Sequence, residues 1–140
     1  MAEAIYTAEA TSSGGGRDGR VRTSDGVLDA ELELPPALGG PGGATNPEQL
    51  FAAAYASCFH GALRLVARNK GVRIGDDATV DAAVHLNKDA TSFAISATLT
   101  AHLPGLDQSQ ADDLVAAAHE VCPYSKATRG NVEVQLKATV

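Results

Sequence analysis

The chain has 140 residues, enough for one ordinary core, and we expect a single domain over residues 1–140. Its 11 Lys and Arg against 17 Asp and Glu give a net charge of −6, so the clustered positive charge of a nucleic-acid-binding surface is not expected. With 44% hydrophobic and 20% charged residues, the composition is typical of a globular chain rather than a disordered one.

Small side chains dominate the hydrophobic residues: there are 26 Ala and no Trp, and aromatic residues make up 4%. An Ala-rich core buries little apolar area per residue, so we expect a partner chain to complete it. The two cysteines, Cys58 and Cys122, are too few for the disulfide framework of a small secreted domain. No secretion signal is expected at the start of the sequence, and the default location is cytoplasmic.

The N-terminal third combines predicted strands with Gly-rich loops. Alternation of polar and apolar residues predicts strands over residues 4–12 and 27–34, and nine of the 14 Gly lie between Gly14 and Gly43. Asn46 followed by Pro47 is typical of a helix start, and the apolar period predicts a helix to about Asn69. Because a central Arg is costly in a membrane, we expect the apolar stretch at 50–67, which contains Arg64, to be a buried core helix.

The C-terminal half again shows strand alternation and a helical apolar period. Strands are predicted over 78–87, 92–103 and 131–140, with a second helix from Asp107 to Cys122. Pro123 ends that helix, because it disfavours helical geometry in the residue before it. The order, roughly βββ–α–ββ–α–β, predicts an α+β fold with the helices on one face of antiparallel strands.

Cys58 and Cys122 lie on the apolar faces of two different predicted helices. The residues alone leave two interpretations open: both are small core residues, or they form a redox pair. A reactive cysteine must be a thiolate, and burial raises the pKa of a thiol. A redox pair therefore requires a nearby cation or hydrogen-bond donor.

Two charged residues could serve such a site. Arg17, in the segment GGGRDGR, is either a solvated turn residue or a cation that flexible glycines bring close to a site. Glu48, in the first helical turn, either complements the helix dipole or holds an Arg by a bidentate pair. Because Glu48 and Cys58 stand roughly 15 Å apart along one helix, we expect the site at a subunit interface, or a loop Arg that bridges the gap.

A zinc-binding module is the alternative from the residues themselves. His119 and Cys122 lie three residues apart on one predicted helix face. Cys58 and His60 point about 200° apart on a helix, so they cannot both bind one ion, and at most three ligands remain. No CxxC pair is present, and Ser57 lacks the GxSxG context of a hydrolase nucleophile.

Four segments, in order and nearly from end to end, resemble the organic hydroperoxide resistance proteins, the Ohr branch of the Ohr/OsmC family. They are YTAEATSSGGGRDGRVRTSDG (6–26), TNPEQLFAAAYASCF (45–59), HLPGL (102–106) and VCPYSKATRGN (121–131). The resemblance implies an OsmC-like α+β fold, with antiparallel sheets wrapped around two central helices in an intertwined homodimer. Ala54 and His60 depart from the residues that the family usually has there.

The resemblance also implies a role for each candidate residue. Cys58 is expected to be the peroxidatic thiol and Cys122 the resolving thiol, with Arg17 stabilising the Cys58 thiolate and Glu48 orienting Arg17. The implied activity is a thiol peroxidase that reduces organic hydroperoxides through a sulfenic acid and a Cys58–Cys122 disulfide. The expected reductant is a dihydrolipoyl dithiol, such as dihydrolipoamide or a lipoylated protein, with no metal, cofactor, nucleic acid or membrane. A sister OsmC-type peroxidase with broader substrate use is the alternative within the family.

Overall fold

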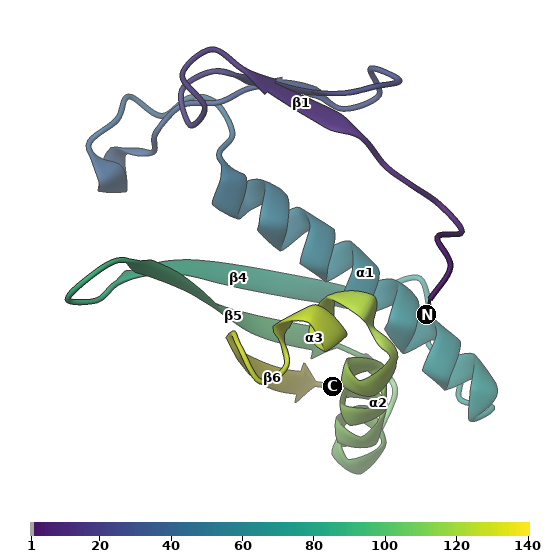
Figure 1. The fold of residues 1–140 in the computed structure, drawn as a ribbon. Helices are drawn as coiled ribbons and strands as arrows, with labels where there is room; N and C mark the ends of the chain where they lie inside the picture. The colour runs from purple at the N-terminus through teal and green to yellow at the C-terminus, as the bar shows by residue number, and fades with distance from the viewer. Residues whose placement is uncertain (1) are drawn as a thin grey trace. The chain divides into compact units, whose positions relative to one another are not determined.

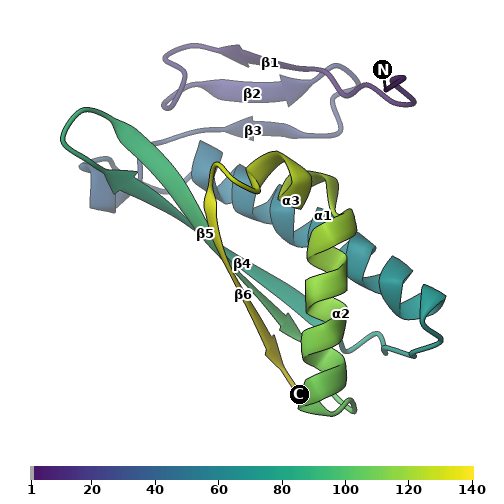
Figure 2. The ribbon, with the colours of Figure 1, turned by 60° about the horizontal axis from the view of Figure 1, so that its bottom comes forward.

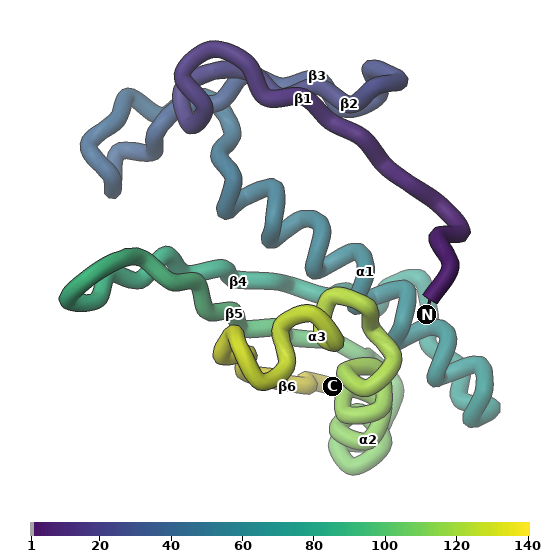
Figure 3. Tube along the Cα trace, viewed as in Figure 1, coloured from purple at the N-terminus to yellow at the C-terminus, as the bar shows by residue number. Residues whose placement is uncertain are grey.

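The computed structural model describes residues 2–140 of the chain. Two compact units make up the structure, Met1–Leu50 and Phe51–Val140, and each is described by itself. The ribbon and the Cα trace show their elements in chain order, from purple at the N-terminus to yellow at the C-terminus (Figures 1 and 3). A single domain over residues 1–140 stays a prediction.

The first unit holds a small antiparallel sheet. Strands β1 (Ala10–Ser13), β2 (Arg20–Thr23) and β3 (Asp29–Glu31) pair in the order β1-β2-β3. The predicted strand over 4–12 is therefore wrong for residues 4–9, where no regular element forms, and the strand over 27–34 is shorter than expected. The predicted order of three strands before the first long helix is correct, but β2 lies outside both predicted ranges because its four residues are too few to establish an alternation. A short 3-10 helix, η1 (Pro36–Leu38), follows.

Helix α1 (Pro47–Asn69) is the longest element of the chain and forms where the sequence predicts it. At its start, the backbone N–H of Gln49 donates to the side-chain oxygen of Asn46 at 2.9 Å, which confirms Asn46 as the N-cap. Just beyond its end, Gly71 adopts a φ of 67°, the left-handed conformation that commonly terminates helices. The helix begins in the first unit and continues through the second.

By length and composition alone, α1 is apolar enough to cross a membrane, and a third of its most apolar window is buried within the chain. Its buried residues, however, include Tyr55, Phe59 and Leu63, which belong to the hydrophobic core of the second unit. Core helices can be as long and as apolar as membrane-spanning ones, and the buried residues of α1 identify it as a core helix.

The second unit contains the larger sheet. Strands β4 (Thr79–Lys88), β5 (Phe93–His102) and β6 (Glu133–Thr139) pair in the order β4-β5-β6 (Figure 2). The expected antiparallel pairing is correct for β4 and β5 and wrong for β6, which runs parallel to β5. The chain passes through two helices between β5 and β6, and such a crossover lets it enter the next strand in the same direction.

The two remaining helices meet at a single residue. Helix α2 (Gln108–Val121) begins at the N-cap Asp107 with a complete capping box. Cys122 follows with an extended ψ of 123°, as Pro123 predicts, and α3 (Pro123–Thr128) starts at once. The hydrophobic pattern does not predict α3, because six residues are too few to establish a helical period.

The core of the second unit draws on α1, β5 and α2. Along β5 the predicted alternation holds for Ala97, Leu99 and Ala101, which are buried, whereas Phe93 at the start of the strand is exposed. The buried cluster contains a large share of alanine, as the composition predicts. Its members are Tyr55, Phe59, Ala62, Leu63, Val66, Ala67, Ala78, Leu99, Ala101, Leu103, Ala111, Leu114, Val115, Ala118 and Cys122.

Candidate active site

The second unit brings the two thiols together. Cys58 lies in the middle of α1, and Cys122 lies at the junction of α2 and α3. Although they are 64 positions apart in the sequence, the Cys122 thiol donates to the Cys58 sulfur at 3.8 Å. Both are free thiols, with Cys122 buried and Cys58 half-buried. Cys58 is therefore partly open to solvent, and a small movement would join the two sulfurs.

The surroundings of Cys58 favour its neutral form. Burial is the largest influence and raises the pKa of the Cys58 thiol, and the neighbouring Cys122 raises it further. One group opposes this: the Tyr124 backbone N–H donates to the Cys58 sulfur and lowers the pKa of Cys58. These neighbours alone leave the pKa raised, so a reactive thiolate requires a further positive charge.

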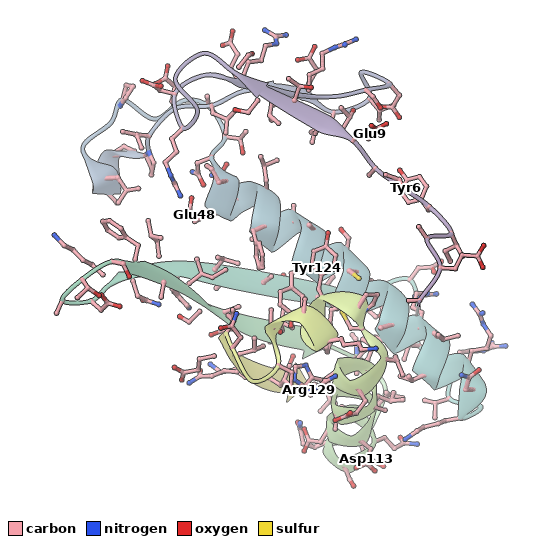
Figure 4. The ribbon with its side chains drawn as sticks, in the orientation of Figure 1. Tyr6, Glu9, Glu48, Asp113, Tyr124 and Arg129 are labelled. Carbon is pink, nitrogen blue, oxygen red and sulfur yellow. The ribbon has the colours of Figure 1, made fainter. Side chains whose placement is uncertain are left out.

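Aromatic side chains lie on the same face of α1 as Cys58. Phe51, Tyr55 and Cys58 follow one another at spacings of four and three residues, and both rings contact Tyr124 of α3. The centroid distances are 6.1 Å for Phe51–Tyr55, 6.4 Å for Phe51–Tyr124 and 5.9 Å for Tyr55–Tyr124. Figure 4 shows Tyr124 projecting from α3 toward α1. The aromatic cluster gives the thiol site an apolar neighbourhood.

The first unit brings Arg17 and Glu48 together. The guanidinium donates two parallel hydrogen bonds to the carboxylate, from Nη1 to Oε2 at 3.0 Å and from Nη2 to Oε1 at 2.8 Å. This bidentate pair lowers the pKa of Glu48 and raises the pKa of Arg17. Of the two interpretations of Glu48, the structure therefore shows the one in which it holds an arginine.

A glycine-dependent turn carries Arg17. Its neighbour Gly16 has a φ of 81°, and a Cβ on Gly19 would lie 2.0 Å from the backbone oxygen of Ser13. Only glycine fits such positions without strain, so the Gly-rich sequence sets the path of the loop between β1 and β2. The loop in turn places Arg17 at the first turn of α1, where Glu48 projects (Figure 4).

Two histidines carry buried ring nitrogens without a hydrogen-bond partner among residues 2–140, namely His60 Nε2 and His119 Nδ1. Burial, and then the charge of Arg129, lower the pKa of His119. Arg129 also donates from Nη1 to the backbone oxygen of His119 at 2.9 Å. Within residues 2–140, no group of three or more His, Cys, Asp or Glu could hold a metal ion, so the zinc alternative gains no support.

Four residues near the cysteines in sequence were not among the predicted site residues: Tyr55, Tyr124, Ser125 and Thr128. The Tyr55 hydroxyl is within 2.9 Å of Ser125 Oγ and 3.0 Å of Thr128 Oγ1. Their signal in the sequence was present but local: Tyr124, Ser125 and Thr128 follow Cys122 within six positions. A helix of six residues gave no periodicity that would have aimed them at α1.

Comparison with known proteins places this geometry in a family. Residues 40–137 match the model of the OsmC-like proteins. The chain is similar to the organic hydroperoxide resistance protein of Xanthomonas axonopodis pv. citri, with 47% identity over 94% of this chain and 93% of the relative.

Two solved structures share the fold along nearly the whole chain. One is a protein from Legionella pneumophila, described as an organic hydroperoxide resistance protein OsmC, predicted redox protein and regulator of sulfide bond formation. It has a TM-score of 0.92 and 49% sequence identity, and the match covers 99% of this chain and 100% of that chain. The other is the organic hydroperoxide resistance protein OhrB of Bacillus subtilis, with a TM-score of 0.87, 47% identity and coverage of 97% and 100%.

The α+β fold is that of the OsmC-like proteins. Within that class, the chain belongs to the family of organic hydroperoxide resistance proteins. The family assignment made from the four sequence segments is thereby confirmed.

Proposed function

We propose that this protein is a cysteine-based peroxidase that reduces organic hydroperoxides to alcohols. The observation that carries the proposal is the pair of free thiols, Cys58 and Cys122, with their sulfurs 3.8 Å apart. Its family is named for resistance to organic hydroperoxides, which supports a role in peroxide detoxification. The apolar neighbourhood of Cys58 supports a preference for bulky organic hydroperoxides over hydrogen peroxide, because apolar substrates gain more from such surroundings.

The proposed chemistry has three balanced steps. First, the Cys58 thiolate attacks the distal, hydroxyl-bearing oxygen of the hydroperoxide and the O–O bond breaks; the alkoxide takes up a proton and leaves as the alcohol, while Cys58 becomes a sulfenic acid. Second, the Cys122 sulfur displaces the hydroxyl of that sulfenic acid, which forms the disulfide and releases water. Third, an external dithiol reduces the disulfide by exchange, returning two thiols and leaving as its own disulfide.

In this proposal the Arg17–Glu48 pair supplies the positive charge that the Cys58 thiolate requires. The support is chemical: the other influences on Cys58 leave its pKa raised, and an arginine is always protonated at neutral pH. A carboxylate that binds two guanidinium nitrogens limits the rotamers of Arg17, which directs its charge. The family resemblance of the GGGRDGR and NPEQLF segments adds support.

We further propose that the functional form is a homodimer and that the reductant is a dihydrolipoyl dithiol on a lipoylated protein. Support for the dimer comes from exposed apolar side chains and from α1, two thirds of whose apolar window is not buried within the chain. The exposed apolar residues include Ile5, Tyr6, Val27, Leu65 and Phe93. The dithiol follows from the family resemblance, as does a cytoplasmic location. Light scattering coupled to size exclusion tests the dimer directly.

The decisive experiment is a peroxide-consumption assay with a matched thiol variant. Wild type and Cys58→Ser are each given cumene hydroperoxide or hydrogen peroxide, with dihydrolipoamide or thioredoxin as the reductant. We expect wild type to turn over cumene hydroperoxide faster than hydrogen peroxide, with dihydrolipoamide and not with thioredoxin, and Cys58→Ser to be inactive. Equal rates for the two peroxides would favour a broader OsmC-type peroxidase. Unchanged turnover by Cys58→Ser would refute the proposal.

A further inference from the structure

A buried hydroxyl network joins α1 to α3 beside the thiols. In the part of the second unit that the structure describes, the buried polar side chains are Ser125 and Thr128, at 0% and 4% exposure. Both hydroxyls face the phenol oxygen of Tyr55, which is itself fully buried, at 2.9 Å and 3.0 Å. Buried polar groups are costly unless they are bonded, and here each one has its partner within this network.

Proton counting fixes the direction of each bond, because every hydroxyl has a single proton to donate. Thr128 Oγ1 donates to the backbone oxygen of Ser125 at 3.1 Å, so it accepts from Tyr55. The Tyr55 proton is then used, so Ser125 must donate to the phenol oxygen. The three side chains thus form a one-way chain, from Ser125 to Tyr55 to Thr128, which has one arrangement of protons.

The network is close in sequence to both cysteines. Tyr55 stands three residues before Cys58 on α1, and Ser125 stands three residues after Cys122. The only regular element that follows Cys122 before β6 is α3, which has six residues and no side-chain cap at its start. A helix that short has little stability of its own, so its position depends on what it is bonded to.

We propose that the Tyr55–Ser125–Thr128 network is a positioning device that holds Cys122 against Cys58. By fastening α3 to α1, it keeps the Cys122 sulfur within reach of the Cys58 sulfenic acid. The inference rests on the proposed peroxidase function and assigns these three residues a part in it that is separate from substrate binding. None of these three side chains exchanges a proton with the substrate.

The network matters because two reactions compete for the oxidised Cys58. Condensation of the sulfenic acid with the Cys122 thiol forms the disulfide and water. Attack of the sulfenate on a second hydroperoxide instead breaks that O–O bond, giving a sulfinic acid and an alcohol and inactivating the thiol. The first path is intramolecular, so its rate depends on how precisely Cys122 is held, and a misplacement of about 1 Å can cost up to about a hundredfold in such a step.

The test uses a matched pair of variants at Thr128 in the 140-residue chain. Thr128→Val keeps the shape and removes the hydroxyl, whereas Thr128→Ser keeps the hydroxyl. After reaction with rising doses of cumene hydroperoxide, mass spectrometry measures the ratio of disulfide to sulfinic acid. We expect Thr128→Val to lower this ratio about tenfold and Thr128→Ser to remain close to wild type. Tyr55→Phe and Ser125→Ala should shift the ratio in the same direction.

A destabilised control separates positioning from general loss of stability. Leu99→Ala empties a fully buried site on β5 that belongs to the same core cluster as Cys122 but takes no part in the hydroxyl network; it should lower the thermal midpoint and change the product ratio far less than Thr128→Val does. If Thr128→Val keeps the wild-type ratio, or if Leu99→Ala lowers the ratio as much, the network is merely structural and the proposal is wrong. If Thr128→Val fails to fold, Ser125→Ala gives the same comparison.

A second measurement keeps this proposal distinct from the peroxidase proposal. The equilibrium between the dithiol and the Cys58–Cys122 disulfide in a glutathione buffer needs no peroxide and reports how well Cys122 is held near Cys58. We expect Thr128→Val to shift this equilibrium toward the dithiol by about tenfold relative to wild type. An inactive wild type with this shift would refute only the peroxidase function, whereas no shift would refute the positioning device.

Discussion

Joining Cys58 to Cys122 should raise the stability of the chain strongly. The disulfide would close the loop between positions 58 and 122, which are 64 positions apart. In the chain-entropy model, a loop of this length costs the unfolded state about 14 cal/mol/K, or about 4 kcal/mol at 25 °C. The native state has little to rearrange, because the sulfurs start 3.8 Å apart and a disulfide needs about 2.0 Å. With a urea slope of about 2 kcal/mol/M, the unfolding midpoint should rise by about 2 M.

Urea unfolding of the reduced and oxidised protein at one protein concentration measures this directly. A thiol count must show two free thiols before oxidation and none after it. Cys122→Ser is the matched control, since treatment with the same oxidant should leave its midpoint in place. A rise below about 0.5 M, which corresponds to about 1 kcal/mol, would mean that bringing the sulfurs together distorts the native packing. The reasoning from the observed geometry would then be wrong.

Four further predictions concern single residues. Cys122→Ser should consume one equivalent of hydroperoxide and leave Cys58 as a sulfenic acid that a dimedone probe traps; sustained turnover with dithiol would contradict its role. Arg17→Ala should raise the pKa of Cys58, as followed by the ultraviolet absorbance of the thiolate, and an unchanged titration would exclude Arg17 as the stabilising charge. Because Arg17 holds the pKa of Glu48 below its usual value, the pair stabilises the fold above about pH 4.3 and loses this contribution as the pH falls through the lowered value. The stability difference between wild type and Glu48→Gln should therefore shrink below pH 4, and a difference that is constant from pH 7 to pH 3 would argue against the pair. Leu63→Ala, at a fully buried site of α1, should cost about 2–5 kcal/mol in chemical unfolding, and a loss under 1 kcal/mol would show that the core is not packed there as described.

Local patterns in the sequence were sufficient for most of the elements. The Asn46–Pro47 start placed α1, the Asp107 cap and Pro123 bounded α2, and strict alternation placed β4, β5 and β6. These signals act over a few residues, and each expresses a backbone requirement, such as an unsatisfied N–H or a two-residue repeat. Both thiols, Arg17 and Glu48 were also recognisable as candidates from the sequence, and the four family segments implied their roles.

Four features depended on contacts between residues distant in the chain, which local sequence patterns do not predict. The 3.8 Å approach of the two sulfurs spans 64 positions, and the Arg17–Glu48 ion pair spans 31. The parallel entry of β6 was missed because alternation describes the faces of a strand and not its direction. The hydroxyl network of Tyr55 exists only once α3 packs on α1, because its three side chains satisfy one another across the two helices. The sequence thus determined which groups the protein has, and tertiary packing decided which of them meet.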